Sequence, residues 1–118
     1  ILIGIENISS GGGNDIVYGN KESNTLNGGT GNDLLVGGEG KDKLIGGEGK
    51  EIFKLSKGEG YDLIQDFKNK QDKIFIGSAN KLKLKNKGKD VNVYIGKDLI
   101  AKVKGAKGDL SLKGKYLV

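Results

Sequence analysis

Glycine-rich and apolar positions recur along the first half of the chain with a period of nine residues. The repeat reads SGGGNDIVY from Ser10, GGTGNDLLV from Gly28 and GGEGKDKLI from Gly37, with looser rows from Gly19 and Gly46. Each row begins with glycines that predict a turn, followed by three residues whose middle member is large and apolar. This pattern predicts a very short strand with one inward side chain, so the chain should coil.

The sixth and eighth positions of the rows are the most regular. After a two-residue slip at Leu55 and Ser56, a further row begins at Lys57. The eighth positions are Val17, Leu26, Leu35, Leu44, Phe53 and Ile64, and the sixth positions are Asp15, Asn24, Asp33, Asp42, Glu51 and Asp62. Two rows should complete one winding, so alternate rows should stack in one sheet and successive rows in opposite sheets.

The composition excludes most catalytic chemistry. The 118 residues include 22 glycines and 20 lysines, but no histidine, cysteine, proline, methionine, tryptophan or arginine. The chain therefore has no imidazole base, no thiol nucleophile and no soft ligand for zinc, copper or iron, and we expect no enzymatic activity. No apolar run approaches the roughly 18 residues of a membrane span, and the abrupt start suggests a piece of a longer protein.

Stacking of alternate rows should bring acidic sixth positions together. The expected neighbours are Asp15 over Asp33, Asp33 over Glu51, Asn24 over Asp42, and Asp42 over Asp62. Stacked carboxylates repel each other unless a cation neutralises them. Glycines in the turns allow carbonyl oxygens to point into the same gap, and Ca²⁺ prefers such a cage of carboxylates and carbonyls, whereas Mg²⁺ needs a tighter octahedron. The rows therefore predict calcium binding that is coupled to folding.

The rows resemble the RTX nonapeptide repeat, G-G-x-G-x-D-x-U-x. GGTGNDLLV and GGEGKDKLI match at every motif position, and the resemblance extends from Ser10 to about Ile76. Such repeats lie at the C-terminal end of bacterial proteins exported by type I secretion, and DLIQDFKNKQDKIFI from Asp62 is similar to the segment that closes the roll in serralysin-type proteases. The resemblance implies an all-β fold, with a short right-handed parallel β-roll over 1–76 and antiparallel capping strands over 77–118.

The resemblance also implies about two to four calcium ions. The implied side-chain ligands are Asp15, Asn24, Asp33, Asp42, Glu51, Asp62, Asp66 and Asp72. The implied turn residues are Gly11, Gly13, Gly28, Gly29, Thr30, Gly31, Gly37, Gly38, Glu39, Gly40, Gly46, Gly47, Gly49, Gly58 and Gly60. We expect one good site between the turns of Asp15 and Asp33 and another between those of Asp42 and Asp62. Asn24 and the longer Glu51 should give weaker sites.

The charge is divided between the two halves of the chain. Residues 1–66 hold 6 lysines against 11 acidic residues, net −5, and residues 67–118 hold 14 lysines against 4, net +10. The segment KLKLKNKGK from Lys81 predicts a half-buried strand with lysines on one face and Leu82 and Leu84 on the other. A hairpin should turn at Gly96 and Lys97, and the last ten residues should form one short strand.

Two interpretations of the lysine row remain open. It could contact a polyanion such as an acidic polysaccharide, or it could keep an exposed sheet edge soluble, and the second is favoured. Nucleic acid is not expected as a partner, because the chain has no arginine and Tyr61, Tyr94 and Tyr116 show no stacking cluster in the sequence.

The resemblance implies a calcium-binding module that folds on meeting extracellular Ca²⁺. It would pass through the type I secretion machinery and serve as the C-terminal folding and export domain of a larger secreted or cell-surface bacterial protein, with the passenger domain upstream. The alternative is a carbohydrate-binding or surface-anchoring module that holds acidic polysaccharide or a surface layer. Ice binding is a third possibility, but it needs a regular threonine array, and only Thr30 holds a turn position.

Overall fold

The computed structural model describes residues 2–3, 7–55, 60–68, 71–77, 81–108 and 110–118. In these ranges the chain forms strands and turns but no helix, and so no helix that could cross a membrane. The first nine strands are β1 (Leu2–Ile3), β2 (Asn7–Ser9), β3 (Ile16–Tyr18), β4 (Thr25–Asn27), β5 (Leu34–Val36), β6 (Lys43–Ile45), β7 (Ile52–Lys54), β8 (Asp62–Ile64) and β9 (Lys73–Phe75). The later strands are β10 (Leu82–Lys87), β11 (Asp90–Ile95), β12 (Asp98–Val103), β13 (Leu112–Lys113) and β14 (Tyr116–Leu117).

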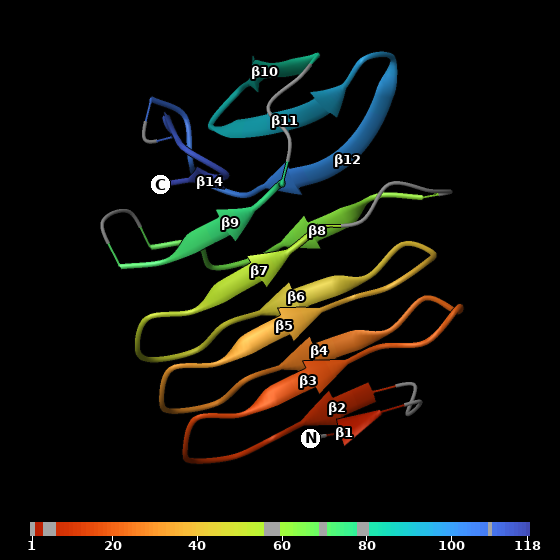
Figure 1. Ribbon diagram of the computed structural model, residues 1–118, viewed down its shortest axis with the longest axis vertical. Helices are drawn as coiled ribbons and strands as arrows, with labels where there is room; N and C mark the ends of the chain where they lie inside the picture. Colours follow the sequence, from red (N-terminus) through yellow and green to blue (C-terminus); the bar gives the residue numbers. More distant parts are fainter. Residues whose placement is uncertain (1, 4–6, 56–59, 69–70, 78–80, 109) are drawn as a thin grey trace.

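The first nine strands wind into a parallel β-roll, with odd-numbered strands in one sheet and even-numbered strands in the other (Figure 1). We call the sheet with order β1-β3-β5-β7-β9-β14-β13 sheet A and the sheet with order β10-β11-β12-β8-β6-β4-β2 sheet B. The register pairs Ile16 with Leu34 and Leu34 with Ile52, which confirms that alternate rows stack in parallel.

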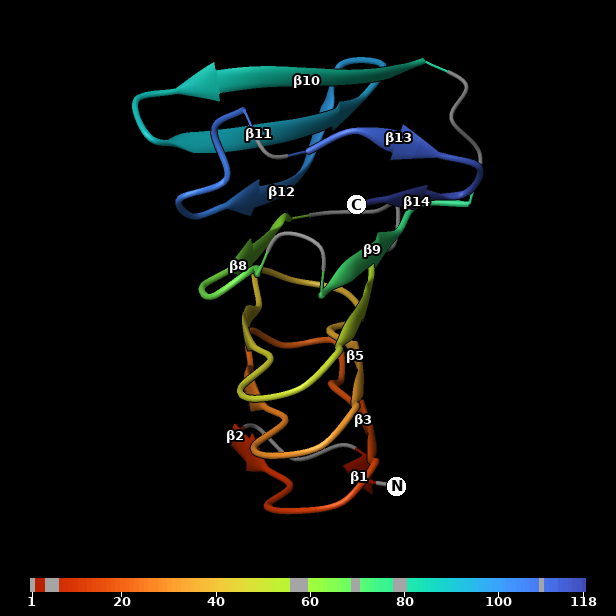
Figure 2. The same cartoon turned by 90° about the vertical axis from the view of Figure 1, so that its left-hand side faces the viewer.

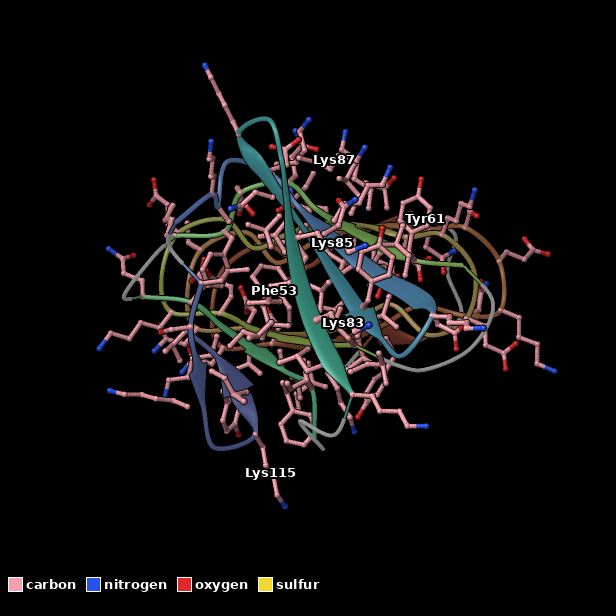
Figure 3. The ribbon with its side chains drawn as sticks, turned by 90° about the horizontal axis from the view of Figure 1, so that it is seen from above. Phe53, Tyr61, Lys83, Lys85, Lys87 and Lys115 are labelled. Carbon is pink, nitrogen blue, oxygen red and sulfur yellow. The ribbon has the colours of Figure 1, made fainter. Side chains whose placement is uncertain are left out.

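The eighth positions form the core between the two sheets. The side chains of Val17, Leu26, Leu35, Leu44, Phe53 and Ile64 are fully buried, as the period predicts. Figure 3 looks down the roll and shows Phe53 between the sheets. Because the strands have only three residues, one inward side chain per row supplies the whole core of each winding.

Strand β9 adds a seventh row that the glycine pattern does not reveal. Its Ile74 is fully buried, and Ile52 pairs with Lys73, so Asp72 and Ile74 stand where a sixth and an eighth position would. The turn before it lacks the glycines of the other rows, which is why the repeat is not visible in the sequence there.

The strands after β9 close the upper end of the roll (Figure 2). Strands β10, β11 and β12 form an antiparallel meander with the predicted turn at Gly96 and Lys97, while β14 adds antiparallel to β9. The meander joins the roll through a parallel contact, since Ala101 of β12 pairs with Asp62 of β8. The roll and these strands share one hydrophobic core, and a domain boundary near residue 76 stays a prediction.

Two details of the C-terminal part differ from the sequence prediction. Strand β10 is not half-buried: Leu84 is 38% exposed and within the strand only Leu82 is partly covered, because β10 is the edge strand of sheet B. The final strand is instead a small hairpin of β13 and β14, because Gly114 takes a positive φ of 60° and reverses the chain. Leu112 stays 42% exposed there.

Neighbouring windings touch through the backbone of their turns. The Thr30 N–H donates to the Gly11 carbonyl at 3.0 Å, and the Glu48 N–H donates to the Gly29 carbonyl at 2.9 Å. A Cβ atom placed on Gly47 would lie 1.9 Å from the Gly29 carbonyl oxygen. The glycines therefore set the distance between windings, which a side chain would increase.

This close approach predicts that Gly47→Ala disrupts the roll far more than Gly88→Ala. Both glycines have positive φ, 88° and 63°, but a Cβ on Gly88 meets nothing within 4 Å. The Gly88 variant should therefore show only the backbone strain of about 1 kcal/mol, and the Gly47 variant should lose the folded state. Denaturant unfolding in calcium followed by circular dichroism measures both, and equal stabilities would show that the windings do not approach so closely.

Candidate calcium-binding turns

The sixth-position residues directly precede their strands, except that Asp62 is the first residue of β8. Asn24, Asp33, Asp42, Glu51 and Asp62 are all less than 5% exposed. One carboxylate oxygen binds the preceding winding: Asp33 Oδ1 accepts from the Asp15 N–H at 2.8 Å, and Asp42 Oδ1 accepts from the Asn24 N–H at 2.8 Å. The predicted stacking of these residues is therefore present, and each contact links two windings.

Several other side-chain atoms of this group are buried and have no hydrogen-bond partner among the residues that the structure describes. They are Asp15 Oδ2, Asp33 Oδ2, Asp42 Oδ2, Glu51 Oε1, Glu51 Oε2 and Asn24 Nδ2. A buried carboxylate oxygen without a partner costs several kcal/mol in general. Such a row of oxygens is stable only if a cation or a proton neutralises it.

Glycine at the first position of a row leaves room for the carboxylate of the same row. A Cβ on Gly28 would lie 2.6 Å from Asp33 Oδ2 and 2.7 Å from the Gly46 carbonyl oxygen, so both oxygens line one gap. A Cβ on Gly46 would in turn lie 3.1 Å from Glu51 Oε2. The space between the third and fifth rows is therefore lined by possible oxygen ligands from Asp33, Glu51 and the Gly46 carbonyl. This set of ligands suits Ca²⁺.

The opposite edge of the roll carries a similar gap. A Cβ on Gly37 would lie 2.6 Å from Asp42 Oδ2, and a Cβ on Gly19 would lie 2.2 Å from the Gly37 carbonyl oxygen and 2.7 Å from Asn24 Oδ1. Asn24 Oδ1 already accepts from the Asn20 N–H at 2.9 Å. This edge therefore offers fewer unpartnered oxygens near Asn24, and the weaker site expected there stays a prediction.

Backbone oxygens have to complete any metal site in these turns. In the part of the chain that the structure describes, no three acidic side chains converge as a metal site of their own. The turn glycines with positive φ are Gly11, Gly13, Gly29, Gly31, Gly38, Gly40, Gly49 and Gly60. The carbonyl oxygens of five of them lie close to the next winding: Gly11, Gly13, Gly29, Gly31 and Gly40. Glu39 and Thr30 are exposed, and Gly58 lies outside the described residues.

Asp66 and Asp72 hold the last turn of the roll. Asp66 accepts from the Gly46 N–H at 2.8 Å and from the Gly47 N–H at 2.9 Å, one with each oxygen. Asp72 accepts from the N–H groups of Glu51 and Lys68, both at 2.9 Å. Both carboxylates thus replace the contacts that a further winding would make, and calcium ligation by them stays a prediction.

Sequence reasoning missed two contributions to the turns. Ser10 stands at the first position of its row in place of glycine, and its hydroxyl donates to the Gly28 carbonyl at 2.6 Å. Asn14 Oδ1 accepts from the Asn32 N–H, and Asn32 Oδ1 accepts from the Lys50 N–H, both at 2.8 Å. These two hydrogen bonds form a ladder of asparagine side chains. Its signal in the sequence is an asparagine directly before the acidic residue in two rows.

Burial and mutual repulsion disfavour the charged form of these carboxyl groups. Burial, followed by contact with Asp72 and the charges of Asp33 and Asp66, raises the pKa of Glu51 to about 8. Burial and the Asp42 carboxylate raise the pKa of Asp62 to about 8. Burial also raises the pKa of Asp33 and Asp42. Without a cation, the folded turns therefore bind protons more tightly than an unfolded chain does.

Twelve lysines lie after residue 72, and those of β10 run across the top of the roll. Figure 3 shows Lys83, Lys85 and Lys87 along this strand. The Lys41 and Lys102 ammonium groups lie 5.0 and 4.9 Å from the Tyr61 ring centroid. For the lysines of β10, contact with a polyanion and protection of a soluble sheet edge both stay predictions.

The comparison with known families agrees with this geometry. Residues 3–35 and 18–50 match the RTX calcium-binding nonapeptide repeat (4 copies). A search of curated proteins found no match. The all-β roll and the matched rows together identify residues 3–50 as an RTX repeat region, and calcium is the partner that this repeat implies.

The raised pKa values predict that acid stabilises the calcium-free roll. Glu51 and Asp62 titrate near 4 when unfolded and at about 8 when folded. The folded state then binds more protons, so its stability should be greatest below pH 4 and should fall as the pH rises through 8. In chelator, β-type circular dichroism should be stronger at pH 5 than at pH 8. Glu51→Gln should reduce this difference, and a signal that grows with pH would contradict the burial of these groups.

Proposed function

We propose that the chain is a non-catalytic calcium-binding RTX module that is unfolded at low calcium and folds when Ca²⁺ enters its turns. The observation that carries the proposal is the row of buried carboxylate oxygens without partners, at Asp15, Asp33, Asp42 and Glu51. Each turn needs a positive charge at this place, and carboxylates with glycine carbonyls supply the hard oxygen ligands that calcium prefers.

The proposal extends to the place where the module works. RTX repeats occur in secreted bacterial proteins. A chain whose fold depends on calcium would remain extended in a compartment poor in calcium and would fold after type I secretion. We therefore assign it the role of a folding and export domain in a larger extracellular or cell-surface protein. The need of the turns for cation supports this role, because the same need would keep the chain unfolded until export is complete.

Calcium should convert the chain from an unfolded to a β-rich state. In chelator at pH 7.5 or above, circular dichroism should lack the β-type signal of the roll, and millimolar Ca²⁺ should restore it, with equal Mg²⁺ much less effective. Asp33→Ala should raise the calcium midpoint more than Asn24→Ala, because Asp33 holds an unpartnered oxygen and Asn24 lacks a carboxylate.

Two results would contradict the proposal. A cooperative β-rich fold that is the same in chelator and in calcium would show that the carboxylates need no metal. Equal midpoints for the two variants would show that the carboxylate of Asp33 is not a ligand.

A further inference from the structure

The outward face of sheet A is unusually apolar for a surface. Two ladders of side chains cross this sheet in register, and they point away from the core because their neighbours Val17, Leu35 and Phe53 point inward. The apolar face consists of Ile16, Tyr18, Leu34, Ile52, Phe75 and Tyr116, while Val36, in the same ladder, is buried. Ile16 and Tyr18 are each 38% exposed.

The same repeat positions are polar on the other side of the roll. Sheet B presents Thr25, Asn27, Lys43 and Lys102 on its outer face, interrupted by Ile45 and Leu63. The two outer faces lie on opposite sides of the roll (Figure 2). The repeat geometry alone therefore does not require apolar residues outside, and a continuous apolar patch on one face is typical of a docking surface.

Lysines occupy the C-terminal end of this face, and no acidic residue stands in either ladder. Lys54 and Lys73 belong to the ladders, and Lys113 pairs with Tyr116 across the last hairpin. The Lys54 ammonium lies 5.8 Å from the Phe75 ring centroid, and that of Lys73 lies 5.5 Å from the Tyr116 ring centroid. Among the described residues these three lysines make no ion pair. The salt bridge in that part of the chain joins Lys104 to Asp90. An occupant should therefore be apolar and carry negative charge.

A shallow hollow lies where the apolar and cationic parts meet. Leu34, Ile52, Lys54, Phe75 and Tyr116 line a volume of about 230 Å³. The Phe75 and Tyr116 rings meet edge to face, with centroids 5.3 Å apart. Such a hollow has room for part of an acyl chain or a headgroup but offers few polar groups that could orient a soluble ligand.

A second copy of the chain fits this face poorly. The five strands from β3 to β14 span about 20 Å, and two outward residues per strand give an area of a few hundred Å², well below the roughly 800 Å² per partner of a stable interface. A bilayer needs no complementary shape: apolar side chains can enter the boundary between headgroups and acyl chains while lysines reach the phosphates.

We propose that the outer face of sheet A docks on an anionic lipid bilayer. Ile16, Tyr18 and Leu34 would enter the interface, and Lys54, Lys73 and Lys113 would contact the negatively charged headgroups. In this orientation the polar outer face of sheet B remains in water. The inference rests on the proposed function only in that the roll has to be folded by calcium first.

The experiment measures sedimentation of the full chain with lipid vesicles in calcium. Vesicles of phosphatidylcholine mixed with phosphatidylglycerol should bind the chain, and pure phosphatidylcholine should bind it much less. Lys54→Gln with Lys73→Gln should weaken binding roughly thirtyfold, since each lysine near an anionic surface contributes about 1 kcal/mol. Ile16→Ser with Tyr18→Ser should weaken it at least as much, because less apolar surface is buried.

Matched variants separate this face from general attraction by a lysine-rich chain. Lys83→Gln with Lys85→Gln removes the same charge from β10, and Ile45→Ser with Leu63→Ser removes apolar groups from sheet B; both should bind nearly as the parent does. Circular dichroism in calcium checks the folding of every variant, and Tyr18→Ser alone replaces the Ile16 and Tyr18 pair if that pair does not fold. If the circular dichroism of the parent chain does not depend on calcium, the proposed function is contradicted. That result alone does not contradict the docking surface.

Three results would overturn the docking surface. Sheet A variants that bind like the parent would exclude this face, and β10 variants that lose as much would show non-specific attraction. Light scattering that finds a parent dimer, and a monomer for Tyr18→Ser, would assign the face to a second copy.

Discussion

Asp33 and Asp42 each hold two windings together with one carboxylate oxygen and leave the other oxygen buried without a partner. Asp33 shows both sides of this arrangement, because Oδ1 accepts from the Asp15 N–H while Oδ2 has no partner. The contact that stacks the windings therefore also creates the charge that opposes stacking. A cation that enters between the turns resolves the conflict, and in its absence protons can do so only in part.

The rest of the roll is arranged around this constraint. Most of the three-residue strands contribute one buried apolar side chain, so the core is too thin to offset a row of uncompensated carboxylates. Glycines such as Gly28 and Gly47 are needed because a Cβ would collide with the carboxylate or with the neighbouring backbone. At the upper end no further winding follows, and Asp66 and Asp72 satisfy the turn of Gly46 and Glu51 with hydrogen bonds instead.

The sequence predicted those features of the roll that recur with the nine-residue period. The nine-residue period correctly placed the core residues, the stacked sixth positions and the parallel register, because each depends only on the phase of the repeat. It could not show β9, whose turn has no glycines, or the parallel contact of β12 with β8, because pairing between distant strands leaves no local signal. The roles of Asp66 and Ser10 depend on which backbone groups the fold brings near them.

The central claim is that the carboxylates of the turns need a metal before the windings can stack. Amide hydrogen exchange tests it at the atoms concerned, because the N–H groups of Asp15, Asn24 and Glu51 donate to sixth-position carboxylates of the next winding. The account predicts slow exchange of these amides in calcium and exchange at the rate of an unfolded chain in chelator at pH 8. Equal protection in both conditions would contradict it.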